Sequence, residues 1–162
     1  MKRILVLLLI GLMACTDKEE SELYTRNKVV YTLQEGSQFP ISGTVTFRER
    51  ISGDLEATIA LSGTEGDINH PAHLHYGSFD TPDAEVAVLL SPVYGETGES
   101  VTVFNKLNDE TPFGFSDLKS FDGHIKVHQD GGPNKNVILA YGNVGAASMN
   151  AFGAKIAVCK NN

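Results

Sequence analysis

Apolar and polar residues alternate with a period of two through most of the chain after residue 40. In the segment 41–50, Ile41, Val45 and Phe47 alternate with small polar residues. This period is typical of a β-strand with one buried and one solvated face. The same alternation recurs in seven further segments, 55–61, 72–76, 85–93, 100–107, 124–129, 136–142 and 154–160.

Turn-forming residues gather between these segments, as in "DTPD" at 80–83 and "DGGPNKN" at 130–136. Only the segment 114–121, "GFSDLKSF", has a helical pattern, and Ser116 is the expected N-cap of one or two turns. Many short strands without a long run of period 3.6 predict an all-β fold. We expect a single antiparallel Greek-key β-sandwich or flattened barrel.

The first fifteen residues have the composition of an export signal that ends in a lipidation site. Lys2 and Arg3 precede an apolar run at 4–14, which is too short to span a bilayer as a permanent helix. The run ends in "LMAC", which resembles a bacterial lipobox, where cleavage before the cysteine exposes it for lipidation. We therefore expect residues 1–14 to be a lipoprotein signal peptide and Cys15 to anchor the protein in the cell envelope, at the outer membrane. An ordinary secretory signal with a chance cysteine is the alternative.

The segment 15–27 is polar and charged, with too few hydrophobic residues to fold, and is expected to be a flexible tether. The domain is then expected to span residues 28–162. The formal charge of the chain is −7, and loss of Lys2 and Arg3 with the signal peptide gives −7 − 2 = −9. An acidic domain argues against nucleic acid and anionic lipid headgroups as partners, so the membrane is expected to be contacted through the lipid anchor only.

The cysteine count leaves no internal disulfide if Cys15 is lipidated, because Cys159 is the only other cysteine. Cys159 is expected to be a small buried residue of the last strand. A reactive or metal-ligating thiol is the alternative.

Three of the five histidines lie within six residues, in "HPAHLH" at 70–75. Alternate residues of a strand share a face, so His73 and His75 point the same way while Leu74 points to the opposite side. Two imidazoles on adjacent rungs can converge on one ion, as in many copper and zinc sites. The pair alone is weak evidence, because most such pairs are exposed polar side chains.

The other two histidines, His124 and His128, lie in the strand segment "HIKVH". The two apolar residues between them are expected to face the core, which leaves both histidines on the opposite face. They would be roughly 13 Å apart on a strand that rises about 3.3 Å per residue. Metal–nitrogen bonds of about 2 Å cannot span that separation, so at most one of the two can share an ion with His73 and His75.

Several short motifs resemble two families of similar architecture. The segment 41–79, from "ISGTVTFRER" to "HPAHLHYGSF", is similar to the N-terminal half of copper–zinc superoxide dismutases, and "HIKVHQDGGPNKNVILAYGNVG" with "GAKIAVC" resembles their C-terminal part. The motifs "HPAHLHYGS", "DGHIKVH" and "VILAYGNVG" equally resemble the CHRD (chordin-type) domain of envelope proteins. These resemblances cover about residues 40–160 and imply a superoxide dismutase-like sandwich.

The resemblance implies a copper ion bound by His73, His75 and His128, which match the copper-ligating histidines of the dismutases. Zinc is the alternative ion for the same site. His70 matches a histidine that the dismutases use structurally, so it is expected to support the site rather than to bind the ion. His124 falls where the CHRD pattern has tyrosine and is expected to be a solvated side chain, with a weak second metal site as the alternative.

The departures from the dismutase pattern are as informative as the matches. The segment 77–93 contains no histidine, so the zinc site and the bridging imidazolate of the enzyme are missing. Lys155, in "GAKIA", stands where the dismutases have the arginine that guides the anion. Arginine and lysine are not equivalent anchors, and an ordinary lysine on a surface strand is the alternative.

Together these features predict metal binding better than they predict turnover. Three neutral imidazoles suit copper and also zinc. Acidic residues in the neighbouring loops would oppose the steering of superoxide, namely Asp80, Asp83, Glu85 and Asp130. The expected function is copper binding by a lipid-anchored envelope protein. The alternatives are a copper-only superoxide dismutase and a non-catalytic interaction or adhesion module without metal. The sequence has no G-x-S-x-G, HExxH or dinucleotide-binding motif that would indicate another enzyme class.

Overall fold

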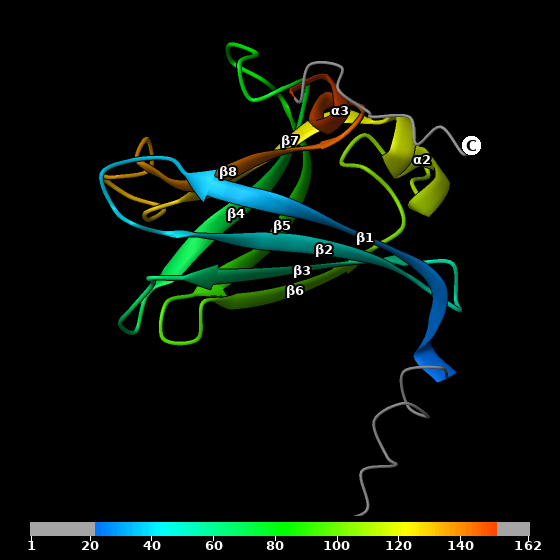
Figure 1. Ribbon diagram of the computed structural model, residues 1–162, viewed down its shortest axis with the longest axis horizontal. Helices are drawn as coiled ribbons and strands as arrows, with labels where there is room; N and C mark the ends of the chain where they lie inside the picture. Colours follow the sequence, from blue (N-terminus) through cyan, green and yellow to red (C-terminus); the bar gives the residue numbers. More distant parts are fainter. Residues whose placement is uncertain (1–21, 152–162) are drawn as a thin grey trace, which may run out of the picture.

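The computed structural model describes residues 22–151, which form an all-β fold with two short helices (Figure 1). This confirms the expected fold class. The strands are β1 (Tyr24–Glu35), β2 (Ser42–Arg50), β3 (Leu55–Ser62), β4 (Asn69–Tyr76), β5 (Val86–Tyr94), β6 (Glu99–Phe104), β7 (Asp122–His128) and β8 (Ile138–Gly145), and the helices are α2 (Phe115–Ser120) and α3 (Ala146–Ala151).

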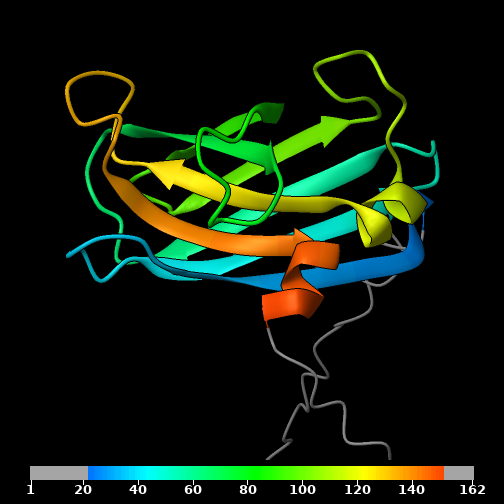
Figure 2. The ribbon, with the colours of Figure 1, turned by 90° about the horizontal axis from the view of Figure 1, so that it is seen from above.

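The eight strands close into a flattened antiparallel barrel in the order β1-β2-β3-β6-β5-β4-β7-β8 (Figures 1 and 2). The chain passes from β3 to β4 and from β6 to β7 without pairing these strands, which is the Greek-key arrangement. Two of the neighbouring strand pairs are joined by few residues. β1 meets β8 through two residue pairs, Gln34 with Tyr141 and Glu35 with Ala140, and β5 meets β6 through the single pair of Tyr94 with Glu99. The barrel therefore resembles two four-stranded sheets joined along two seams.

The core lies between these two sheets and follows the alternation in the sequence. On β2, Val45 and Phe47 are fully buried, and on β7, Ile125 and Val127 are fully buried. Leu74 of β4 is also inaccessible to solvent. The opposite faces of β4 and β7 therefore point outward from the barrel, and those faces carry histidines.

The first strand begins earlier than the sequence indicated, inside the segment 15–27 that was expected to be a tether. Tyr24 pairs with Arg50 of β2, and its hydroxyl donates a hydrogen bond to Oε1 of Glu56 at 2.8 Å. The guanidinium of Arg48 lies 3.9 Å from the centre of the Tyr24 ring. Polar cross-strand contacts hold this end of β1, so hydrophobic alternation does not reveal it.

The helical prediction at 114–121 is confirmed by α2, but the expected cap is wrong. Gly114 is the N-cap, and its N–H donates to Oδ2 of Asp117 at 2.8 Å. Ser116 lies in the first turn of the helix and is exposed. The helix α3 was not predicted. No helix among residues 22–151 is long and apolar enough to cross a membrane.

Several sequence predictions fall outside the described residues. These are the signal peptide at 1–14, the lipidated Cys15, the strand at 154–160, Lys155 and Cys159.

Candidate metal centre

Adjacent strands place four of the five histidines on one outer face of the barrel, all except His70. β4 and β7 pair in antiparallel fashion, with His75 opposite His124 and His73 opposite Lys126. His128 lies two residues beyond Lys126, so it is the diagonal neighbour of His73 on the same face. The prediction that His124 and His128 lie on the face opposite the core agrees with this register.

Three of these histidines form one cluster. His73, His75 and His128 each offer one ring nitrogen, and these three atoms all lie within 4.8 Å of one another. The ring centroids of His73 and His128 are 5.0 Å apart, and those of His73 and His75 are 5.7 Å apart. Nitrogen ligands of a tetrahedral ion are about 3.3 Å apart when each metal–nitrogen bond is about 2 Å. Small ring movements would therefore bring the three nitrogens onto a single ion.

A break in the β7–β8 ladder lies beside His128. Val127 pairs with Ala140 and His128 with Ile138, so the register shifts by one residue on β8. The Nδ1 atom of His128 is 2.6 Å from the carbonyl oxygen of Lys135, in the connection that follows. This hydrogen bond holds the ring of His128 in its orientation.

Hydrogen bonds to backbone carbonyls also fix the protonation pattern of two ligands. Nδ1 of His75 lies 2.9 Å from the carbonyl oxygen of Ala84, as Nδ1 of His128 lies close to that of Lys135. A carbonyl oxygen only accepts, so in the neutral ring each Nδ1 carries the proton and each Nε2 presents a lone pair. Both Nε2 atoms are buried and have no hydrogen-bond partner in the described part of the chain. An unpaired buried nitrogen costs about 1–3 kcal/mol, and a metal ion would remove that cost.

The environment favours the neutral form of two candidate ligands, His73 and His75. Burial, together with the neighbouring His128 and His75, lowers the pKa of His73 to about 4. Burial also lowers the pKa of His75, although its hydrogen bond to Ala84 acts in the opposite direction. Only the neutral imidazole binds a metal, so these groups are ready to bind at neutral pH.

The connection between β4 and β5 covers this face of the barrel (Figure 2). It begins at Gly77, whose φ of +72° suits glycine and whose carbonyl oxygen accepts a hydrogen bond from Nδ1 of His124 at 2.7 Å. Phe79 then stacks on Tyr141 of β8 with ring centroids 3.7 Å apart, and its N–H donates to Oδ1 of Asn143. The segment that follows supplies the carbonyl of Ala84. One short connection therefore orients two histidines of different strands.

His124 is fully buried, and the expectation of a solvated side chain is wrong. Its ring lies parallel to that of His75, with centroids 4.9 Å apart and planes inclined by 7°. Burial lowers its pKa to about 4, and its Nε2 has no hydrogen-bond partner in the described chain. The covering connection buries this outward-facing residue, and strand alternation alone cannot predict such a cover.

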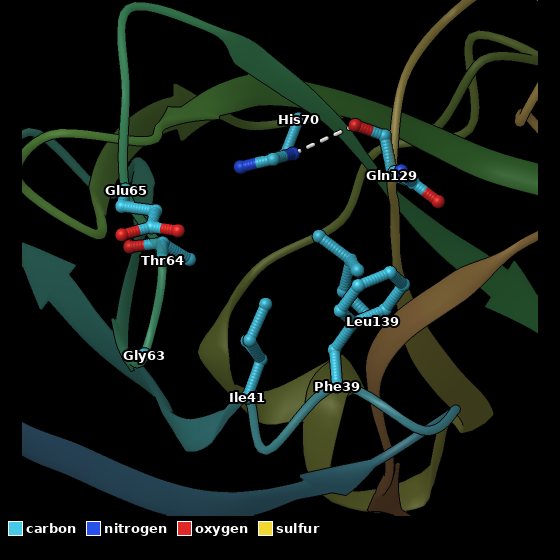
Figure 3. A pocket seen from close by; sticks show the side chains of 8 residues that line it. All are labelled: Phe39, Ile41, Gly63, Thr64, Glu65, His70, Gln129 and Leu139. Carbon is cyan, nitrogen blue, oxygen red and sulfur yellow. Dashed lines mark hydrogen bonds between the residues drawn. The ribbon is translucent and has the colours of Figure 1, made fainter.

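His70 does not join the cluster. It is buried, as are the inward-facing Ala72 and Leu74 of the same strand, and its Nδ1 lies 2.8 Å from the carbonyl oxygen of Gln129. Gln129 directly follows His128. His70 thus holds the backbone next to a candidate ligand, and its ring borders a separate cavity (Figure 3).

The charges around the centre are mixed. Lys126 lies on the same outer face, half-buried, with Nζ 5.5 Å from the centre of the Phe79 ring. Neither Lys126 nor Phe79 was predicted to belong to the site, although the alternation of β7 puts Lys126 beside the histidines. Asp80, Asp83 and Glu85 of the covering connection are exposed.

The fold and the site define a class of protein, an antiparallel Greek-key barrel with a three-histidine cluster on its outer face that could hold a metal ion. In comparisons with known proteins, no family model, curated protein or solved structure matches the chain.

Proposed function

We propose that this protein is a lipid-anchored protein of the bacterial cell envelope that binds one copper ion through His73, His75 and His128. The observation that carries the proposal is the convergence of three ring nitrogens within 4.8 Å. Two of the three rings have Nδ1 bonded to a backbone carbonyl and a buried Nε2 without a partner among residues 22–151. Hydrogen-bonded imidazoles of this kind are typical of metal ligands.

The choice of copper rests on the donor set. Three neutral imidazole nitrogens bind copper more tightly than the other divalent metals of the first row, and zinc is the alternative ion. The motif resemblance to copper–zinc superoxide dismutases and CHRD domains supports the same choice. Turnover of superoxide is not part of the proposal, because the exposed carboxylates of Asp80, Asp83 and Glu85 would repel that anion near the site.

The test is a copper titration of the purified protein beside its His73→Ala and His128→Ala variants. We expect about one copper ion per chain in the unchanged protein and nitrogen hyperfine structure in its electron paramagnetic resonance spectrum. Both variants should lose this signal. His70→Asn is the matched control, because it removes a histidine of β4 outside the cluster while its side-chain amide can still donate to the carbonyl oxygen of Gln129. Retention of full copper binding in either Ala variant would overturn the assignment.

The anchor is tested separately. In a bacterial host, the unchanged protein should incorporate radiolabelled palmitate and fractionate with membranes, and the Cys15→Ala variant should do neither. If the label is absent from the unchanged protein, the anchor proposal fails while the metal proposal stands. If copper does not bind, a non-catalytic interaction module becomes the better description.

A further inference from the structure

A cavity of about 140 Å³ lies at the end of the barrel where the β1–β2, β3–β4 and β7–β8 connections meet (Figure 3). The residues that line it are Phe39, Ile41, Gly63, Thr64, Glu65, His70, Gln129 and Leu139. None of them belongs to the histidine cluster described above. The cavity is therefore a separate feature of the fold.

His70 supplies a directed acceptor to this cavity. The side chain is 5% exposed, and Nδ1 is held 2.8 Å from the carbonyl oxygen of Gln129. Because that carbonyl only accepts, Nδ1 carries the proton and Nε2 of the neutral ring is an acceptor. Nε2 has no hydrogen-bond partner among residues 22–151, and Figure 3 shows it pointing into the cavity toward the side of Thr64 and Glu65.

The opposite rim carries a negative charge. Glu65 is exposed, and its carboxylate has no ion pair or hydrogen bond within the described chain. It is the only charged residue that lines the cavity in that part of the structure. A ligand that donates hydrogen bonds and carries positive charge would satisfy both the imidazole and the carboxylate.

Three apolar side chains form another part of the wall. Phe39, Ile41 and Leu139 line the side of the cavity that lies away from Glu65 (Figure 3). An apolar wall is a poor partner for water and a good one for a short aliphatic chain. A cavity of this volume is comparable to one of about 150 Å³ that binds benzene, so about five or six non-hydrogen atoms fit.

We propose that this cavity binds a primary ammonium group on a short aliphatic stem. The ammonium donates to Nε2 of His70 and to the carboxylate of Glu65, and the stem packs against Phe39, Ile41 and Leu139. A metal ion fits less well, because His70 and Glu65 form no cluster of three histidine, cysteine, aspartate or glutamate ligands in the described chain. A free alkylamine and the side chain of a lysine share this chemistry.

The test follows the imidazole signals of His70 by nuclear magnetic resonance during titration with n-butylammonium chloride. A ligand this small should bind with a dissociation constant of about 1–10 mM. Butanol and pentanoate have the same butyl stem without the positive charge, and neither should shift the His70 signals. Blocked lysine, Nα-acetyl-lysine methylamide, separates the two sources. Binding of both amines indicates that a lysine side chain can enter, and binding of n-butylammonium alone indicates a free amine.

The Glu65→Gln variant should bind n-butylammonium roughly fivefold more weakly or worse, since it keeps the shape of the side chain and removes its charge. Asp80→Asn is the matched control, because it removes one exposed charge beyond the other end of β4 and should leave binding unchanged. Equal binding of butanol, unchanged binding in Glu65→Gln, or no His70 shift at about 100 mM amine would each overturn the proposal. The same titration in the His73→Ala/His128→Ala protein gives a further check. A shift of the His70 signals with Zn²⁺ and none with n-butylammonium would also overturn the proposal. If the unchanged protein binds no copper, the amine proposal still stands, because the cavity shares no residue with the histidine cluster.

Discussion

The imidazole rings of His75 and His124 lie parallel, with centroids 4.9 Å apart, although only His75 belongs to the three-histidine cluster. Both rings are tied to the same connection, His75 to the carbonyl of Ala84 and His124 to that of Gly77. His124 therefore contacts the candidate metal centre through the ring of His75, against which it stacks.

Replacement of His124 should weaken copper binding without abolishing it. His124→Ala removes the stacked ring and the hydrogen bond to Gly77, and we expect a roughly 10- to 100-fold loss of copper affinity. His124→Phe keeps a flat ring against His75 and should lose less. Competition with a copper chelator measures both affinities. Because His124 is not a proposed ligand, the His124→Phe variant should still bind one copper ion per chain. Complete loss of copper binding in this variant would indicate that His124 is itself a ligand.

The metal-free protein should lose stability as the pH falls from about 6.5 to about 4. In the folded protein, burial lowers the pKa of His73 and that of His124 to about 4, whereas both are near the usual 6.5 in the unfolded chain. In this window the unfolded state binds more protons, so acid favours unfolding; below it, both states are protonated and the effect is complete. Urea denaturation at several pH values measures the slope.

The matched variant for the pH experiment is His124→Phe, which removes one of the two buried groups. Its free energy of unfolding should fall less steeply over the same pH window. An identical slope in the two proteins would contradict the assignment of this acid sensitivity to His124.

The Gly77→Ala variant should lower both stability and copper affinity. Gly77 has a φ of +72°, and a Cβ there would lie 2.5 Å from Oγ1 of Thr81. We expect a loss of about 1–3 kcal/mol in the free energy of unfolding. The covering connection would also shift, with its carbonyls for His75 and His124. Thermal denaturation and a chelator competition measure the two effects.

A matched glycine separates the two effects of Gly77→Ala. Gly66 has a φ of +81° with nothing within 4 Å of the position that a Cβ would occupy. Gly66→Ala should therefore carry the conformational penalty alone, and its copper affinity should equal that of the unchanged protein. A loss of affinity in this variant would show that affinity follows global stability rather than the position of the connection.

The Leu74→Ala variant should destabilise the barrel by about 2–5 kcal/mol, because it opens a cavity in the core. Leu74 is fully buried between the two outward-facing histidines of β4. Val30 is 51% exposed, and Val30→Ala should change the free energy of unfolding by about 0.5 kcal/mol or less. Equal effects of the two substitutions in urea denaturation would contradict the assignment of Leu74 to the core.

The alternation of the sequence was sufficient to predict the faces of the strands. The inward direction of Leu74, Ile125 and Val127 follows from a period of two. So does the outward direction of the histidines other than His70. The spacing of His124 and His128 correctly limited the cluster to one of them. Choosing His128 depended on the motif resemblance, because the register of β4 against β7 and the hydrogen bond of His128 to Lys135 are not visible in the sequence.

The features that were missed depend on contacts between distant segments. The burial of His124 comes from a connection that starts at Gly77 and is fixed by the stacking of Phe79 on Tyr141. The start of β1 at Tyr24 depends on hydrogen bonding and cation–π contacts across strands, which leave no hydrophobic period. Each case requires knowing which segments become neighbours.

The two junctions with few residue pairs have a consequence for transient opening of the barrel. β4 and β7 lie in the interior of one sheet, flanked by β5 and β8, while the narrow junctions fall at β1–β8 and β5–β6. If the two sheets separate transiently at these junctions, the pairing of β4 with β7, the strands that carry the histidine cluster, stays intact. An ion seated there could outlast openings that expose much of the apolar interior to solvent.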